Sequence, residues 1–305
     1  MAAETAGATY LATQATHSLT DTAQNRYSLL GEDMETDNAG IWLKYGHSNF
    51  NVDGLEMSNL DGKFDGNYNT ISLGFDFARN ANFAQGVALG YAKGSSSGRF
   101  ESNDFHVGGL SYYGAVRHGR SNTLFDLGYY KAKSDIDGVI EANLDTDLLS
   151  LGVKNEYRFD AGEHASYVPY IGLHWTRVNT DSYTGSYGGN AAFSYNPSTE
   201  NLFTIPLGVS YLKETQAKDW NYKFKINLGY IAALGGRSAD MNVATIGISN
   251  ARGTASYDIA DQSTWLAGLG LSASNDKMHW GLGYQYHHSS DSHGRNITAN
   301  IGWSF

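Results

Sequence analysis

Near its end, the chain carries the stretch YHHSSDSHGR, which gathers residue types that can build a hydrolytic site. His287 and His288 offer a base, Ser289 and Ser290 a nucleophile, and Asp291 an orienting carboxylate. Neighbouring residues on a strand point to opposite faces, so the two histidines cannot serve one site there. We place the run in the last loop, among polar residues, and predict no catalytic residue in it.

The same stretch offers imidazole nitrogens from His287, His288 and His293, which could bind a metal ion adventitiously. The chain has no cysteine, so it has neither thiolate ligands nor disulfides. We expect no metal centre and no cofactor.

A second set of charged residues lies on two segments whose polarity alternates. Lys154, Glu156 and Arg158 share one parity of the first segment, and Lys223 and Lys225 share one parity of the second. On strands, each group lies on a single face. Exposed ion pairs stabilise little individually. As a set, we expect these residues to line an internal polar wall that holds another element or tunes ion passage.

The composition narrows the class of protein. A net charge of −10 without a basic stripe argues against a nucleic-acid partner. The mean hydropathy of −0.40 and the lack of a run of about 18 apolar residues exclude membrane-spanning helices. Abundant aromatic residues and rare proline are typical of β-structure. A transmembrane β-barrel is compatible with all of this, because its apolar side chains occupy alternate positions.

The strands that must position these residues are visible as alternating segments after residue 40. About twelve segments show the period-2 pattern of a β-strand. They centre on residues 41–47, 69–78, 84–93, 105–117, 122–132, 149–159, 166–176, 201–212, 222–231, 263–273, 278–286 and 296–305.

The connections between these segments alternate between long and short. Long ones lie near residues 47–66, 94–103, 133–145, 177–199 and 234–261, short turns lie near residues 79–82, 118–121, 160–163, 216–219 and 274–277, and the last connection, 287–294, is modest. This sorting predicts short turns at one membrane surface and long loops at the other. We therefore predict an all-β fold, a twelve-stranded antiparallel transmembrane up-and-down barrel formed by residues 32–305.

The polar parity of these strands carries a glycine near mid-strand again and again, at Gly74, Gly90, Gly128, Gly152, Gly172, Gly208, Gly229, Gly268, Gly283 and Gly302. Glycine in a strand often marks the close approach of another element. A lumen lined by glycine has room for such an element. We expect it to contact Gly74, Gly152 and Gly229 together with the charged wall.

Residues 1–31 are the candidate for that element. The segment lacks alternation and contains Gly31, a helix terminator. About 25 helical residues span roughly 38 Å, the height of a barrel. Apolar residues recur at helical spacing at Leu11, Ala15, Leu19, Ala23 and Tyr27. We predict a linker helix inside the pore, with a disordered or surface leader as the alternative. The start, MAAETAGATYLATQ, is no signal peptide. The chain is then either cytosolic or a fragment whose export signal lies upstream, and we favour the fragment.

With these elements in place, the chain resembles the translocator domain of monomeric autotransporters, the type V secretion proteins of Gram-negative bacteria. The resemblance rests on a helix ending near AQNRYSLLGEDM, a first strand opening on Gly40-Ile41-Trp42 and a last strand closing on Trp303-Ser304-Phe305. It covers essentially the whole chain and lies more in architecture than in any motif. It implies a monomeric outer-membrane translocator, not an enzyme, that anchors and exports its own N-terminal passenger domain.

The resemblance also implies the other partners. In that family the barrel assembly machinery reads a terminal strand that ends on an aromatic residue, which corresponds to Ile301, Trp303 and Phe305. Periplasmic chaperones, membrane lipid and lipopolysaccharide complete the set. An even strand number puts both barrel ends on the periplasmic side. The N-terminal end of the helix is then expected to face the cell exterior.

Some members of that family cleave the passenger inside the pore at an Asn-Asn pair, with help from acidic residues of the lumen. This chain has Gln24-Asn25-Arg26, so the paired asparagine is absent. Asn25, Asp76 and Asp126 are the corresponding candidates, and ordinary pore lining is the reading that we favour for them.

Two other functions stay open from the residues alone. An outer-membrane enzyme of the acyl hydrolase or protease type would use the His-Ser run, and its activity would depend on Ser289 or Ser290. A plain porin would have a lumen that conducts without removal of any helix.

Overall fold

The computed structural model describes residues 2–30, 39–57, 60–98 and 101–305. Within these ranges the chain forms one α-helix, α1 (Ala2–Gln24), the short 3-10 helix η1 (Asn25–Tyr27), and strands that belong to a single antiparallel sheet. Gly31 and the predicted boundary between residues 31 and 32 lie outside the described residues. Neither described helix is long and apolar enough to cross a membrane.

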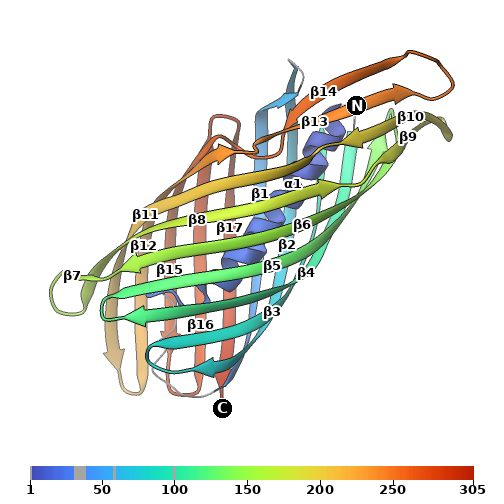
Figure 1. Cartoon of the computed structure of the whole chain (residues 1–305). Helices are drawn as coiled ribbons and strands as arrows, with labels where there is room; N and C mark the ends of the chain where they lie inside the picture. Colours follow the sequence, from blue (N-terminus) through green and yellow to red (C-terminus); the bar gives the residue numbers. More distant parts are fainter. Residues whose placement is uncertain (1, 31–38, 58–59, 99–100) are drawn as a thin grey trace.

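Twelve strands form a closed wall, as predicted (Figure 1). In chain order they are β1 (Gly40–Met57), β2 (Leu60–Arg79), β3 (Phe83–Gly98), β4 (Glu101–His118), β5 (Ser121–Gly138), β6 (Ala142–Tyr157), β8 (Ala165–Thr180), β11 (Thr199–Ala217), β12 (Trp220–Gly235), β15 (Ser263–Ser274), β16 (Met278–Ser289) and β17 (Ser292–Ser304). Each pairs with the next strand of the wall, and β7 (Phe159–Asp160) adds a short pairing to β8. The barrel closes where β17 pairs with β1, with Gly40 opposite Ser304.

The remaining strands extend the wall at one end. They are β9 (Tyr183–Tyr187), β10 (Asn190–Pro197), β13 (Ser238–Thr245) and β14 (Arg252–Asp258). β10 pairs with both β9 and β13, and β13 pairs with β14, so these strands form a small sheet over the barrel mouth. In Figure 1 this sheet lies at the end opposite the C-terminus, and the short turns lie at the C-terminal end.

The prediction of long loops is therefore wrong, because most residues of these connections belong to paired strands. β1 and β2 pair out to Met57 and Leu60, and β16 and β17 leave only residues 290–291 between them. The pairing continues the register of the strands below, so each extended hairpin satisfies its own backbone N–H and C=O groups. The sorting of long and short connections to opposite ends is as predicted.

The strands alternate in exposure with the predicted parity. On β2, Ile71, Leu73 and Phe75 are 41–45% exposed, whereas Ser72 and Asp76 are buried. The outward residues of the other wall strands are likewise large and apolar. A continuous apolar outer surface of this kind belongs in lipid.

The helix α1 runs through the inside of the barrel (Figure 1). The predicted apolar face comprises Leu11, Ala15, Leu19 and Ala23 of α1 and Tyr27 of η1, and all five residues are at most 2% exposed. In its N-terminal half, Tyr10 and Leu11 pack in one cluster with wall residues such as Phe50, Tyr68 and Phe105. The interior core is therefore built between the helix and the wall.

Candidate functional site

A buried ion pair joins the helical segment to the barrel wall at η1. The Arg26 guanidinium donates to the Asp76 carboxylate, with Nη2–Oδ2 at 2.6 Å and Nε–Oδ2 at 3.1 Å. The Tyr113 hydroxyl donates to Asp76 Oδ1 at 2.6 Å, and Trp42 Nε1 donates to the Tyr113 hydroxyl at 2.7 Å. The two charged side chains are 6% and 0% exposed. Removing either partner would leave the other charge buried and uncompensated. The pair therefore holds η1, and with it the helix, against β2.

Glu156 on β6 provides a second attachment. Its carboxylate accepts from the Ser28 hydroxyl at 2.7 Å and from the Leu29 backbone N–H at 2.8 Å. Lys154 Nζ lies 2.9 Å from the same carboxylate, and Asn122 donates to the Tyr27 carbonyl at 2.9 Å. The wall thus binds the backbone of the chain just after the helix.

At the last residue of α1, the Gln24 side chain donates to Asp126 Oδ1 at 2.7 Å. The other Asp126 oxygen lies 3.8 Å from His174 Nε2, and that same nitrogen lies 2.8 Å from the Ser150 hydroxyl. A serine nucleophile needs its serine and its carboxylate on different ring nitrogens of the histidine. This group therefore has the residue types of a hydrolase but not the geometry.

The structure does not bring Asn25 together with Asp76 or Asp126. Asn25 Nδ2 donates to the Asp21 carbonyl at 2.8 Å, and its Oδ1 accepts from Lys154. The two carboxylates instead bind the neighbours of Asn25, namely Arg26 and Gln24. The residue types of a cleavage site are present, but each carboxylate accepts hydrogen bonds from a side chain other than Asn25.

The three glycines expected to contact the helix have different neighbours. A Cβ at Gly152 would lie 2.5 Å from Gln24 Nε2, so this glycine does face the helix. At Gly74 the space is taken by the Trp42 ring, and at Gly229 by the Tyr170 hydroxyl. Trp42 is the cross-strand partner of Gly74. Tyr170 reaches Gly229 from two strands away, past Gly208 of β11. In both cases an aromatic side chain of the wall fills the space over the glycine, so this space is used by the wall and not by the helix.

The five charged residues expected to line the wall also have different partners. Lys154 and Glu156 contact the helix end, as described above. Arg158 instead binds Glu214 on β11, and Lys223 Nζ lies 3.7 Å from the same Glu214 carboxylate. Lys225 lines the lumen cavity beside the helix. Through Glu214, Arg158 and Lys223 thus link the chain directly after β6 to β11 and β12.

At the other end of the barrel, a loop closes over the helix. Asp261, between β14 and β15, accepts from the Tyr10 hydroxyl at 2.9 Å, from Ser289 at 2.9 Å and from Ser292 at 2.8 Å. Burial raises the pKa of the Asp261 carboxyl. Nearby, the hydroxyl groups of Thr5 and Tyr183 form a hydrogen bond. We call Tyr10, Asp261, Ser289 and Ser292 the mouth cluster, since it fastens α1 to the rim.

The His-Ser run was predicted to be a loop and is instead the β16–β17 hairpin. His287 and His288 lie on β16, half-buried and exposed respectively, on opposite faces. Ser289 belongs to the mouth cluster, and Ser290 is exposed in the turn. Across the described ranges, no three histidine or carboxylate side chains gather as a metal site.

The terminal residues Ile301 and Trp303 lie on β17, where they pair with Leu43 and Ile41 of β1. Trp303 is 44% and Phe305 70% exposed. The Phe305 backbone N–H donates to the Ala39 carbonyl at 3.0 Å. The last strand therefore seals the barrel with its aromatic side chains turned outward.

Two groups of this site were missed from the sequence. Trp42 lies on the polar parity of its strand and opposite Gly74 on the next, and an aromatic residue in that position could have predicted the ring over the glycine. Asp261 offers no comparable signal, since its partner Tyr10 is 251 residues away in the chain.

The chain was compared with known proteins. The family model described as "Autotransporter beta-domain" matches residues 41–287. The translocator domain of autotransporter NalP from Neisseria meningitidis has a TM-score of 0.73 at 14% identity, over 97% of this chain and 96% of that one. The transport unit of autotransporter AIDA-I from Escherichia coli has a TM-score of 0.63 at 14% identity, over 99% of each chain.

Among curated proteins, YaiT from Salmonella typhimurium is 29% identical over 146 residues, which make up 44% of this chain and 14% of that relative. This chain thus spans a small part of the relative's length. The structural likenesses, at low identity, support the fold. The family match covers well over half of the chain and includes eleven of the twelve wall strands in full or in part. The chain belongs to the autotransporter β-domain family.

Proposed function

We propose that this chain anchors a longer protein in the membrane and exports the N-terminal part of that protein, its passenger, to the cell surface. The observation that carries the proposal is α1, a 23-residue helix inside a closed barrel. The mouth cluster fastens it at one end, and Arg26 and Glu156 contribute to its attachment at the other. A chain fixed along the whole pore in this way is what remains after an upstream segment has passed through.

Membership of the family assigns the barrel to the outer membrane of a Gram-negative bacterium. Within the proposal, residues 1–31 link the passenger to the pore, residues 32–305 form the translocator, and the N-terminal end of the helix faces the cell exterior. The proposed assembly signal is Ile301, Trp303 and Phe305. The barrel assembly machinery, periplasmic chaperones, lipid and lipopolysaccharide are its proposed partners, and the barrel acts as a monomer.

The alternatives have less support. A porin for solutes needs a wide lumen, whereas α1 runs through the inside of this one and takes up much of its width. A hydrolase needs a serine, a histidine and a carboxylate in relay, whereas Ser289 donates to Asp261 directly and His174 uses one nitrogen for both neighbours. The family is a secretion unit rather than a family of enzymes.

The orientation can be tested with single cysteines, because the natural chain has none. Ile248 is 61% exposed in the β13–β14 turn, and the Asp160 side chain is 57% exposed at the opposite end. A membrane-impermeant maleimide added to intact cells should label Ile248→Cys, and should label Asp160→Cys only after the outer membrane is permeabilised. The reverse pattern would contradict the proposed direction of export.

A further inference from the structure

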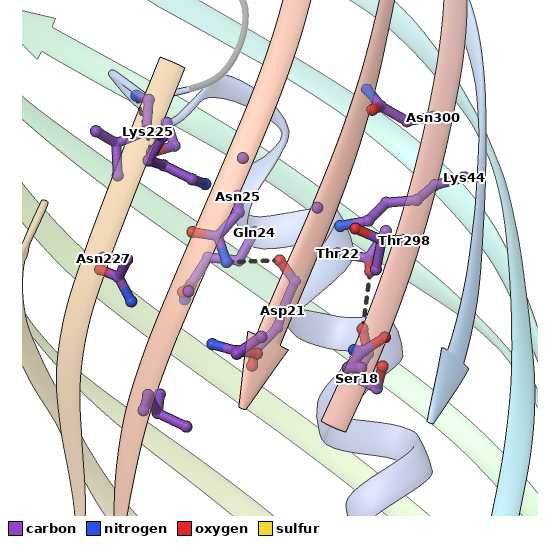
Figure 2. Close-up of a pocket in the computed structure, with 18 of the residues that line it drawn as sticks. Ser18, Asp21, Thr22, Gln24, Asn25, Lys44, Lys225, Asn227, Thr298 and Asn300 are labelled. Atoms are coloured by element: carbon purple, nitrogen blue, oxygen red, sulfur yellow. Dashed lines mark hydrogen bonds between the residues drawn. The ribbon is translucent and has the colours of Figure 1, made fainter. Parts of the chain in front are cut away.

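The helix leaves one side of the lumen open. α1 packs mainly against β2–β6. Between the helix and the wall formed by β12 and β15–β17 lies a cavity of about 480 Å³. Figure 2 shows its polar lining, with Asp21 and Asn25 from the helix and Asn227 and Thr298 from the wall. One water molecule needs about 10–15 Å³ of such space, so the cavity has room for water and for a hydrated ion.

Two ammonium groups face this cavity without a partner. Lys44 on β1 and Lys225 on β12 reach into it from opposite sides (Figure 2). Neither makes a hydrogen bond or an ion pair with any described residue. Lys154 and Lys223 also line the cavity, but their charges lie 2.9 Å from Glu156 and 3.7 Å from Glu214.

Among the described residues, the carboxylates that line the cavity do not balance these charges. The carboxylates that line the cavity are Asp21 and Asp261. Asp261 is engaged by three hydroxyl donors in the mouth cluster. Within the described part of the chain, two cations without an ion-pair partner therefore face one carboxylate, Asp21, in the central part of the cavity. Walls of low dielectric constant strengthen the field of such fixed charges, and rings or pairs of cations select anions in pores.

Neighbouring polar side chains could also bind an anion. Asn227 lies on β12 with Lys225, and Thr298 and Asn300 lie on β17 beside Lys44 (Figure 2). All three line the cavity, and each can donate a hydrogen bond. We propose that the cavity is an anion path, in which small inorganic anions such as chloride bind and pass beside the seated helix, with Lys44 and Lys225 as the selectivity charges.

The test is the ion selectivity of the purified chain, with its helix intact, measured as the reversal potential in planar bilayers under a potassium chloride gradient. The reversal potential should show a chloride-to-potassium permeability ratio of about three or more, because one unit charge about 7 Å away biases an ion by that factor even at the dielectric constant of water. Lys44→Gln with Lys225→Gln should bring the ratio to about one or below. Asp21→Asn should increase it.

The matched control removes two lysines outside the cavity. Lys131 and Lys133, 67% and 62% exposed on β5, pair with Asp147 and Asp145. Their replacement by Gln should leave the ratio unchanged. A wild-type chain that prefers potassium, that does not discriminate, or that carries no current would overturn the proposal. An unchanged ratio in the Lys44 and Lys225 variant would do the same. Surface display of a passenger, scored in the same strains, reports on export separately.

Discussion

The Arg26–Asp76 pair gives the sharpest test of how the helix is held. Replacing Arg26 by Ala leaves the Asp76 carboxylate buried without its cation, while the Tyr113 hydroxyl still donates to it. Breaking a buried pair by removing one partner costs about 3–5 kcal/mol. The hydroxyl still contributes its charge-assisted hydrogen bond, so we take the lower figure. About 3 kcal/mol corresponds to roughly a 160-fold shift toward the released helix.

Single-channel recording measures that shift directly, because a released helix opens the lumen. Arg26→Ala should raise the fraction of time spent in large openings by about two orders of magnitude. Arg120→Ala is the control, since its ion pair with Asp160 is 57% exposed on both sides and is worth about 0–1 kcal/mol. The combined Arg26→Ala and Asp76→Ala variant should open less than the sum of the single changes, because no buried charge is left alone. Large openings that are as rare in Arg26→Ala as in the wild type would refute this reasoning.

Three further outcomes are expected. Changing Trp303 and Phe305 together to Ser should sharply reduce the heat-modifiable, folded barrel in the outer membrane, and normal amounts would reject the assembly signal. Gly152→Leu should increase conductance, since its Cβ alone would lie 2.5 Å from a helix side chain, whereas Gly229→Leu should not; equal effects would rule out this placement of the helix. Burial raises the pKa of Asp261, so its stabilising contribution is complete below about 3.9, the ordinary value, and decreases as pH rises; urea unfolding at several pH values should show this relative to Asp261→Asn, and parallel curves would contradict it.

The wall strands could be predicted from the sequence because lipid on one side and a lumen on the other impose a period of two. The strand ends could not, since beyond the lipid both faces meet water and alternation fades. The run Ser95-Ser96-Ser97 shows this: it has no apolar parity, yet it pairs with residues 65–67 of β2. Pairing there follows from the register of the strands below it.

The site was predictable in part for the same reason. Parity correctly indicates that Lys154 and Glu156 face the lumen, but it cannot say which acid a given cation will meet. Arg158 pairs with Glu214, and Asp261 with Tyr10, across contacts that depend on the closed barrel. These choices follow from three-dimensional packing, which local periodicity does not contain.

Export of an upstream segment is the central property proposed for this barrel. An epitope placed directly upstream of residue 1, behind a periplasmic export signal, tests it with antibody on intact cells. The epitope should be accessible at the surface while the barrel is folded, and should be lost from the surface when β17 (Ser292–Ser304) is deleted. An epitope that is reached only after the outer membrane is permeabilised, in cells with a normally folded barrel, would contradict the proposed function.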